Sequence, residues 1–170
     1  MKTLLACLLT ALCICASAAP GADVVDACIN TESHSTKVHY TEIDVTAFDV
    51  IEDQEAKKTS TLIRHGKDRF GTWESGNSDV FGLVFNGTET PLTRVIRMDK
   101  RNVPSEFSPY EAIWGVVQDG KTSYICATFN FDGIGKSGSF QNVRGLYLIE
   151  RNKQRTAPFY AVGKVSMGEK

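Results

Sequence analysis

Histidines are the first residues to consider, because imidazole serves both as an acid–base group and as a metal ligand. The chain has three of them, His34, His39 and His65. His34 and His39 lack the spacing of a zinc-binding pair and have no third ligand nearby, which argues against a zinc site. His65 stands between Arg64 and Gly66 at the expected end of a strand, which is typical of a turn residue. We therefore expect no bound metal.

Two common catalytic motifs are missing from the chain. There is no G-x-S-x-G element for a serine nucleophile and no P-loop for a nucleotide phosphate. We therefore expect no cofactor.

Residues 1–18 have the three features of a cleavable secretory signal. Lys2 provides the positive charge, residues 4–15 form an apolar run, and Ala16-Ser17-Ala18 gives the small-x-small cleavage pattern. A membrane anchor is the alternative, but the run is shorter than the ~20 residues that span a bilayer. We expect cleavage after Ala18 and secretion of residues 19–170 as a single domain.

Two cysteines remain once the signal is removed, Cys28 and Cys126. A lone pair of cysteines in a secreted chain predicts a disulfide, because the secretory route is oxidising. The alternative is a free catalytic thiol, but no histidine lies near Cys126 in the sequence to activate it.

Asn86-Gly87-Thr88 is an N-glycosylation sequon that follows the apolar run 80–85. The same Asn-Gly pair is also characteristic of a tight hairpin turn. The sequence therefore predicts an exposed turn at Asn86 and a glycosylation site there.

The charge balance excludes two classes of partner. With 19 basic and 20 acidic residues, the chain has no basic excess to attract a nucleic-acid backbone. It has no polybasic run for anionic lipid and no later apolar segment long enough to cross a membrane. We expect neither a nucleic acid nor a membrane as partner.

The strands that must position these residues are marked by short β-branched and apolar runs separated by turn residues. We predict strands at 59–63, 80–85, 92–98, 111–118, 121–131, 143–150 and 159–165, after an irregular leader over 19–37. About seven or eight such strands, with no long helical period, predict an all-β fold, either an antiparallel β-barrel of about eight strands or a β-sandwich.

The clearest local prediction is a hairpin turning at Asp119-Gly120. This turn would pair Gln118 with Lys121, and Trp114 with Ile125. One face of the hairpin would carry Trp114, Val116, Ile125, Ala127 and Phe129, and the other Ile113, Val117, Tyr124 and Cys126.

Residues 138–145 read GSFQNVRG, preceded by a glycine-rich turn. This segment resembles the G-x-F-x-x-A-R-G element of dirigent proteins and related allene-oxide-cyclase-like barrels, with Val143 in place of the alanine. The resemblance implies that Arg144 lines the interior or mouth of a barrel as the catalytic residue. The alternative is that the segment only forms a barrel corner, where Gly145 lets the strand coil.

The same resemblance implies a ligand inside the barrel, a small and largely apolar organic molecule. The barrel would steer its cyclisation or coupling without a cofactor. The aromatic side chains that we expect to hold this molecule are Trp114, Tyr124 and Tyr147.

A second interpretation is a non-enzymatic secreted effector or binding protein that acts through its surface. Small disulfide-bonded β-rich scaffolds of this kind resemble inactive relatives of secreted fungal-type ribonucleases. Glu111 could then stand for the base, and Arg144 or Arg151 for the phosphate clamp, but no histidine follows residue 65 to supply the late acid.

Overall fold

The computed structural model describes residues 19–78, 80–131, 142–153 and 157–166, and these residues are mostly β-strand. The predicted all-β fold is confirmed. The expected signal, residues 1–18, lies outside the described residues, as do residues 138–141 of the dirigent-like segment. None of the described helices is long and apolar enough to cross a membrane.

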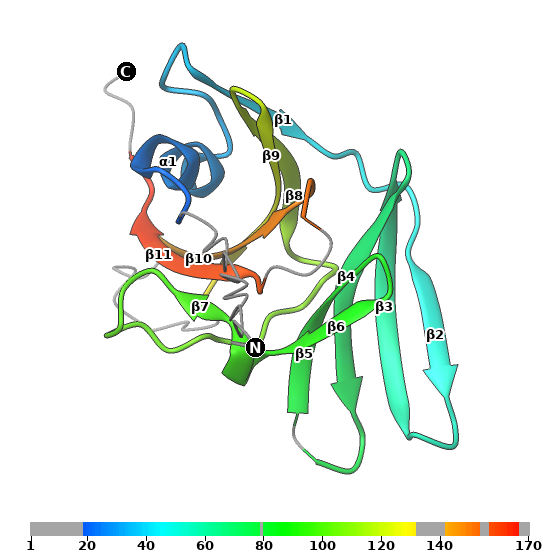
Figure 1. Cartoon of the computed structure of the whole chain (residues 1–170). Coiled ribbons are helices and arrows are strands. Elements are labelled where there is room, and N and C mark those ends of the chain that lie inside the picture. Colours follow the sequence, from blue (N-terminus) through cyan, green and yellow to red (C-terminus); the bar gives the residue numbers. More distant parts are fainter. Residues whose placement is uncertain (1–18, 79, 132–141, 154–156, 167–170) are drawn as a thin grey trace, which may run out of the picture.

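The strands form two separate sheets, and neither closes into a barrel (Figure 1). The six-stranded sheet contains, in spatial order, β1 (Val38–Glu42), β8 (Ile113–Asp119), β9 (Thr122–Asn130), β10 (Val143–Glu150), β11 (Phe159–Lys164) and β7 (Ile96–Arg97). The five-stranded sheet contains β2 (Asp49–Asp53), β3 (Lys58–His65), β4 (Asp68–Ser75), β5 (Val80–Phe85) and β6 (Thr88–Pro91). Neighbouring strands are antiparallel except β11 and β7, which are parallel.

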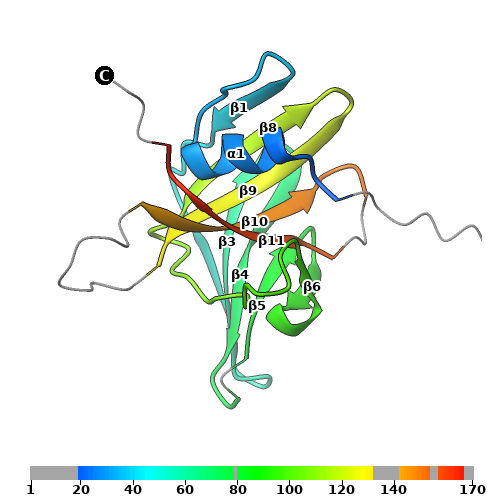
Figure 2. The same ribbon diagram turned by 90° about the vertical axis from the view of Figure 1, so that its left-hand side faces the viewer.

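The central strands of the six-stranded sheet, β9 and β10, are buried on both faces, and both of their faces are accordingly apolar. Residues of both sheets meet in an inter-sheet core, which contains Ile63, Phe70, Leu83, Phe85, Phe107, Trp114, Ile125, Phe129, Tyr147 and Tyr160 among others. On the opposite face, helix α1 (Ala22–Asn30) packs across β8, β9 and β10 and builds a helix-side core (Figure 2). That core includes Val24, Ala27, Cys28, Ile29, Val117, Tyr124, Cys126, Leu146 and Leu148.

The prediction of an irregular leader over residues 19–37 is wrong, because Ala22–Asn30 form the helix α1. Its buried residues Val24, Ala27 and Cys28 recur at helical spacing, but only over nine residues. An isolated helix of this length is marginal in water, so packing on the sheet stabilises it. Thr31, in the left-handed conformation, ends it with its N–H bonded to carbonyls of the last turn.

The hairpin formed by β8 and β9 has a different register from the predicted one. Trp114 pairs with Ala127 instead of Ile125, and the turn residues are Gly120 and Lys121. The φ of Gly120 is 56°, with glycine at the first turn position as in a type II′ turn, whereas the predicted Asp119-Gly120 turn needs positive φ at both residues. The observed register differs from the predicted one by two residues, so every side chain stays on the face that was predicted for it.

Other stretches also differ from the expectation, since β1, β2 and β6 are not among the predicted strands. Residues 92–98 form a 3₁₀ turn, Leu92–Arg94, and only the two-residue strand β7. Strand β4 was not predicted, because arginine, glycine and glutamate interrupt its apolar residues. Strands β5 and β10 have the predicted bounds.

Candidate functional site

The residues predicted to hold a ligand lie in two different layers. Trp114 and Tyr147 belong to the inter-sheet core, whereas Tyr124 belongs to the helix-side core. Arg144 also faces the helix, because it bonds to a carbonyl of α1. Successive strand side chains point to opposite faces, so this separation follows from the strand positions. The four side chains do not converge on one site.

Aromatic rings fill the space around Trp114 and Tyr147. Phe107 stacks on Phe129 and Tyr147, with ring centroids 4.7 and 5.6 Å apart, and lies 6.0 Å from Trp114. Trp114 Nε1 donates to the Pro109 carbonyl at 3.0 Å, and Tyr147 Oη donates to a loop carbonyl at 2.6 Å. These polar atoms are satisfied by the protein, as is usual for buried aromatic residues.

Burial also sets the ionisation of two tyrosines in this core. It raises the pKa of the Tyr147 hydroxyl far above its ordinary value and that of Tyr160 to about 12. Both phenols therefore stay neutral at physiological pH. The inter-sheet core is a packing layer in which a bound molecule would have to displace aromatic rings.

Arg144 lies at the C-terminal end of helix α1. Its Nη1 donates to the Ile29 carbonyl oxygen at 2.7 Å, in the last turn of α1, which contains no basic residue of its own. A cation there satisfies an orphan carbonyl and complements the negative end of the helix dipole. The structure thus gives Arg144 a capping contact.

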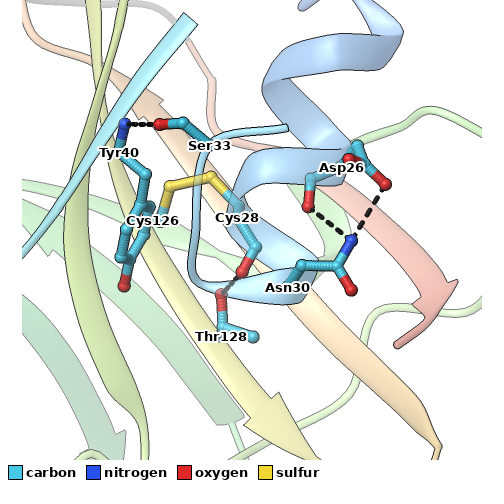
Figure 3. The surroundings of a disulfide bond; sticks show 7 residues. All are labelled: Asp26, Cys28, Asn30, Ser33, Tyr40, Cys126 and Thr128. Atoms are coloured by element: carbon cyan, nitrogen blue, oxygen red, sulfur yellow. Dashed lines mark hydrogen bonds between the residues drawn. A yellow bond between two sulfur atoms is a disulfide. The ribbon is translucent and has the colours of Figure 1, made fainter. Parts of the chain in front are cut away.

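The disulfide between Cys28 and Cys126 joins α1 to β9 and confirms the predicted pairing (Figure 3). Both cysteines are fully buried in the helix-side core. Beside the sulfur atoms, Thr128 Oγ1 donates to the carbonyl of Cys28 at 2.9 Å. A covalent bond and a buried hydrogen bond therefore hold the end of the helix on the sheet.

Asn86 lies in the predicted hairpin turn, between β5 and β6, and is exposed. Its φ is 47° and that of Gly87 is 80°, which is the pattern of a type I′ turn. Its Nδ2 donates to Asp68 Oδ1 at 3.1 Å, and its Oδ1 accepts from the Arg69 N–H at 2.8 Å. The sequon is accessible, and glycosylation of Asn86 stays a prediction.

Asp68 is at the centre of a contact between the two sheets. Its side chain is 3% exposed, and its Oδ2 accepts from Nε and Nη2 of Arg151 at 2.7 and 2.6 Å. Burial acts to raise the pKa of Asp68, but hydrogen bonds from Asn86 and Arg151 and the charge of Arg151 outweigh it and lower this pKa. The Arg151 guanidinium is thus engaged in a structural ion pair.

A groove of about 520 Å³ runs between α1, β11 and the loop that follows β7. Its volume is in the range of small-molecule sites, whereas two other hollows measure about 190 and 130 Å³. Three segments distant in sequence line it: Ala22, Val25, Asp26 and Ile29 from the helix, Ala161–Lys164 from the strand, and Met98, Asp99 and Asn102 from the loop.

The helix face of this groove has a sequence signal that went unrecognised. The lining positions 22, 25, 26 and 29 follow the i, i+3, i+4, i+7 pattern of one helix face. The remaining lining residues could not be found in this way, because the fold alone brings them beside α1.

The groove carries carboxylates on two of its walls. On the loop, Asp99 pairs with Arg101 at 2.6 Å, and hydrogen bonds from Arg101 lower the pKa of Asp99 to about 2. On the helix, Asp26 accepts from Asn30 Nδ2 at 2.9 Å and contacts His34 Nδ1 at 3.0 Å. Asp99 is therefore ionised throughout the physiological range, next to an apolar floor.

His34 also contacts Glu32 through Nε2 at 2.8 Å, and its hydrogen bonds to Glu32 and Asp26 raise its pKa. The two carboxylates bind opposite nitrogens of the ring and do not converge on one point. Among the described residues, no group of three or more His, Cys, Asp or Glu side chains is arranged to hold a metal ion.

No protein-family model, no curated protein and no solved structure matches this chain. Its own geometry is therefore the basis for inferring its function.

Proposed function

We propose that this is a secreted, non-enzymatic binding protein that holds its ligand in the groove between α1 and β11. The observation that carries the proposal is the groove itself, in which Val25 and Met98 offer apolar surface beside the carboxylates of Asp26 and Asp99. A few polar groups around an apolar surface are the usual composition of a ligand site. The ligand would be a molecule with an apolar body and a polar or cationic end.

Binding fits the groove better than catalysis does, because both of its carboxylates already have partners within the protein. Asp99 is paired with Arg101, and Asp26 with Asn30 and His34. A general base needs a free acceptor within reach of the substrate proton.

The cyclising or coupling role implied by the dirigent-like segment has less support. Arg144, its expected catalytic residue, bonds to the helix, and Tyr147 lies in the other layer beyond the sheet. The space between the sheets is occupied by stacked rings. These positions support a surface-acting protein over one that encloses its substrate.

Secretion is part of the proposal. The signal-like residues 1–18 and the disulfide are both compatible with passage through an oxidising compartment.

The test is nuclear magnetic resonance mapping of residues 19–170 with small phenolic and terpenoid amines as probes. We expect backbone shift changes confined to α1, β11 and the loop 98–102. Ala22→Trp would fill the groove from the exposed start of α1 and abolish these changes, whereas Asp23→Trp, next to it but outside the lining, would leave them intact. Shift changes centred on Trp114 and Tyr147 would instead favour an enclosed substrate.

A further inference from the structure

Along β11, the backbone N–H and C=O groups of successive residues point alternately toward β10 and toward β7. The carbonyls of Pro158 and Tyr160 accept from the N–H groups of Ile96 and Met98 at 2.8 and 2.9 Å, so these even-numbered residues face β7. Strand geometry repeats every two residues. Val162 and Lys164 therefore direct their N–H and C=O groups to the same side as Tyr160.

Strand pairing on that side of β11 stops early. On its other edge, β11 pairs with β10 from Phe159 to Lys164. On the β7 edge, among the described residues, the pairing covers only Phe159 and Tyr160. Within the described part of the chain, the β7 edge of β11 is therefore unpaired beside Val162 and Lys164, and residues 161–164 line the groove.

The groove beside this open edge has apolar lining residues. Val25 of α1 and Met98 of the loop after β7 are half-buried and line the groove, and both pack against the helix-side core. At about 3.3 Å per residue, the open stretch of β11 matches about three to four residues of an extended chain. Such a chain would continue the sheet in the place where β7 ends.

We propose that the ligand of the groove is a short extended peptide that adds as a strand to β11 beside Val162 and Lys164. This inference rests on the proposed function, which places the binding site in the groove. Addition of a strand to an exposed sheet edge is a general mode of peptide recognition, in which main-chain hydrogen bonds provide affinity and side-chain contacts provide specificity.

Charge indicates which peptide fits. The lining contains two acidic residues, Asp26 and Asp99, and one basic residue, Lys164. The Arg101 side chain that pairs with Asp99 is 88% exposed, so it can swing away at little cost. A peptide that carries both apolar and lysine or arginine side chains would offer cations to these carboxylates and apolar contacts to Val25 and Met98.

The experiment titrates residues 19–170 with the blocked peptide acetyl-Lys-Val-Lys-Val-Lys-Val-amide and follows backbone resonances. Two further peptides carry N-methyl groups on alternate residues, one on the lysines and one on the valines. Only one edge of an added strand faces β11, so we expect one methylated peptide to bind at least about tenfold more weakly and the other to bind nearly as well. Equal binding by both methylated peptides would overturn strand addition.

Protein variants test the same edge from the other side. Val162→Pro removes an N–H that faces the groove and leaves the bonds to β10 in place, as proline is tolerated on an edge. Lys164→Pro does the same at the exposed end of the strand and serves if Val162→Pro fails to fold. Each variant should bind the peptide without N-methyl groups about tenfold more weakly. Unchanged affinity in a folded variant would contradict the proposal.

The two proposals fail in different ways. If the phenolic or terpenoid amines shift groove resonances and the Lys-Val peptide does not, the peptide assignment is wrong and the groove remains the binding site. If neither kind of probe shifts them, the proposed function itself is wrong.

Discussion

Arg144 and Ile29 are joined by a 2.7 Å hydrogen bond from the guanidinium Nη1 to the carbonyl oxygen, across 115 residues of sequence. The bond links the second residue of β10 to the last turn of α1. It explains how a short helix without basic residues at its end is held on the sheet, together with the disulfide and the Thr128 hydroxyl. The helix that this bond holds is also a wall of the groove.

Arg144→Gln should lower the free energy of unfolding by roughly 1–2 kcal/mol, because it removes a charged donor from the helix end. Urea denaturation measures this, with Arg101→Gln as the control on an exposed loop. The variant should retain groove binding if it is folded. Loss of ligand binding by a folded variant of unchanged stability would instead point to a direct role for Arg144 in the site.

Removal of the disulfide should lower the free energy of unfolding by more than Arg144→Gln does. Cys28→Ala combined with Cys126→Ala opens a loop with a sequence separation of 98 residues, and we expect a loss of about 2–4 kcal/mol. Hydrogen exchange should show the largest loss of protection in α1, which the bond ties to β9. Uniform loss of protection throughout both sheets would contradict the idea that the disulfide acts through the helix.

Gly145, the last residue of the dirigent-like segment, leaves room for an aromatic ring. A Cβ at this position would lie 2.5 Å from Phe129 Cζ, a ring stacked in the inter-sheet core. Gly145→Ala should therefore destabilise the fold by about 1–3 kcal/mol through overpacking. Exposed Gly76→Ala is the control, since a Cβ there would meet only the Lys57 carbonyl oxygen, at an ordinary contact distance of 3.4 Å. Thermal unfolding of both variants measures the difference, and similar melting temperatures would refute the steric account.

The buried pair of Asp68 and Arg151 predicts a dependence of stability on pH. Because folding lowers the pKa of Asp68 below its ordinary value of about 3.9, the unfolded state binds more protons in this range. The contribution of Asp68 to stability is therefore fully present above the unfolded pKa and is lost as the pH falls through the folded pKa.

Asp68→Asn should consequently cost roughly 3 kcal/mol at pH 7, where it leaves Arg151 without its counter-ion, and clearly less near pH 3. Urea denaturation at both values measures the change, with exposed Glu55→Gln as the control. A penalty of the same size at both pH values would show that the charge of Asp68 does not stabilise the native state.

The sequence by itself determined the features that depend on local pattern. Period-two alternation decided which face each residue of the β8–β9 hairpin occupies, and that prediction is correct even though the register is shifted. The bounds of β5 and β10, the exposed turn at Asn86 and the pairing of Cys28 with Cys126 were likewise predictable. These features need only neighbouring residues, or a unique partner.

Only the tertiary structure decided where these elements meet. The hairpin register depended on whether Asp119 or Gly120 takes the first turn position. The flanking apolar pattern does not distinguish the two registers, because both place every side chain on the same face. The helix α1 is too short for its period to stand out, and it is stabilised by contacts with five strands. The groove, and the place of Arg144 beneath the helix, arise because packing brings segments far apart in the chain side by side, and no local signal encodes that proximity.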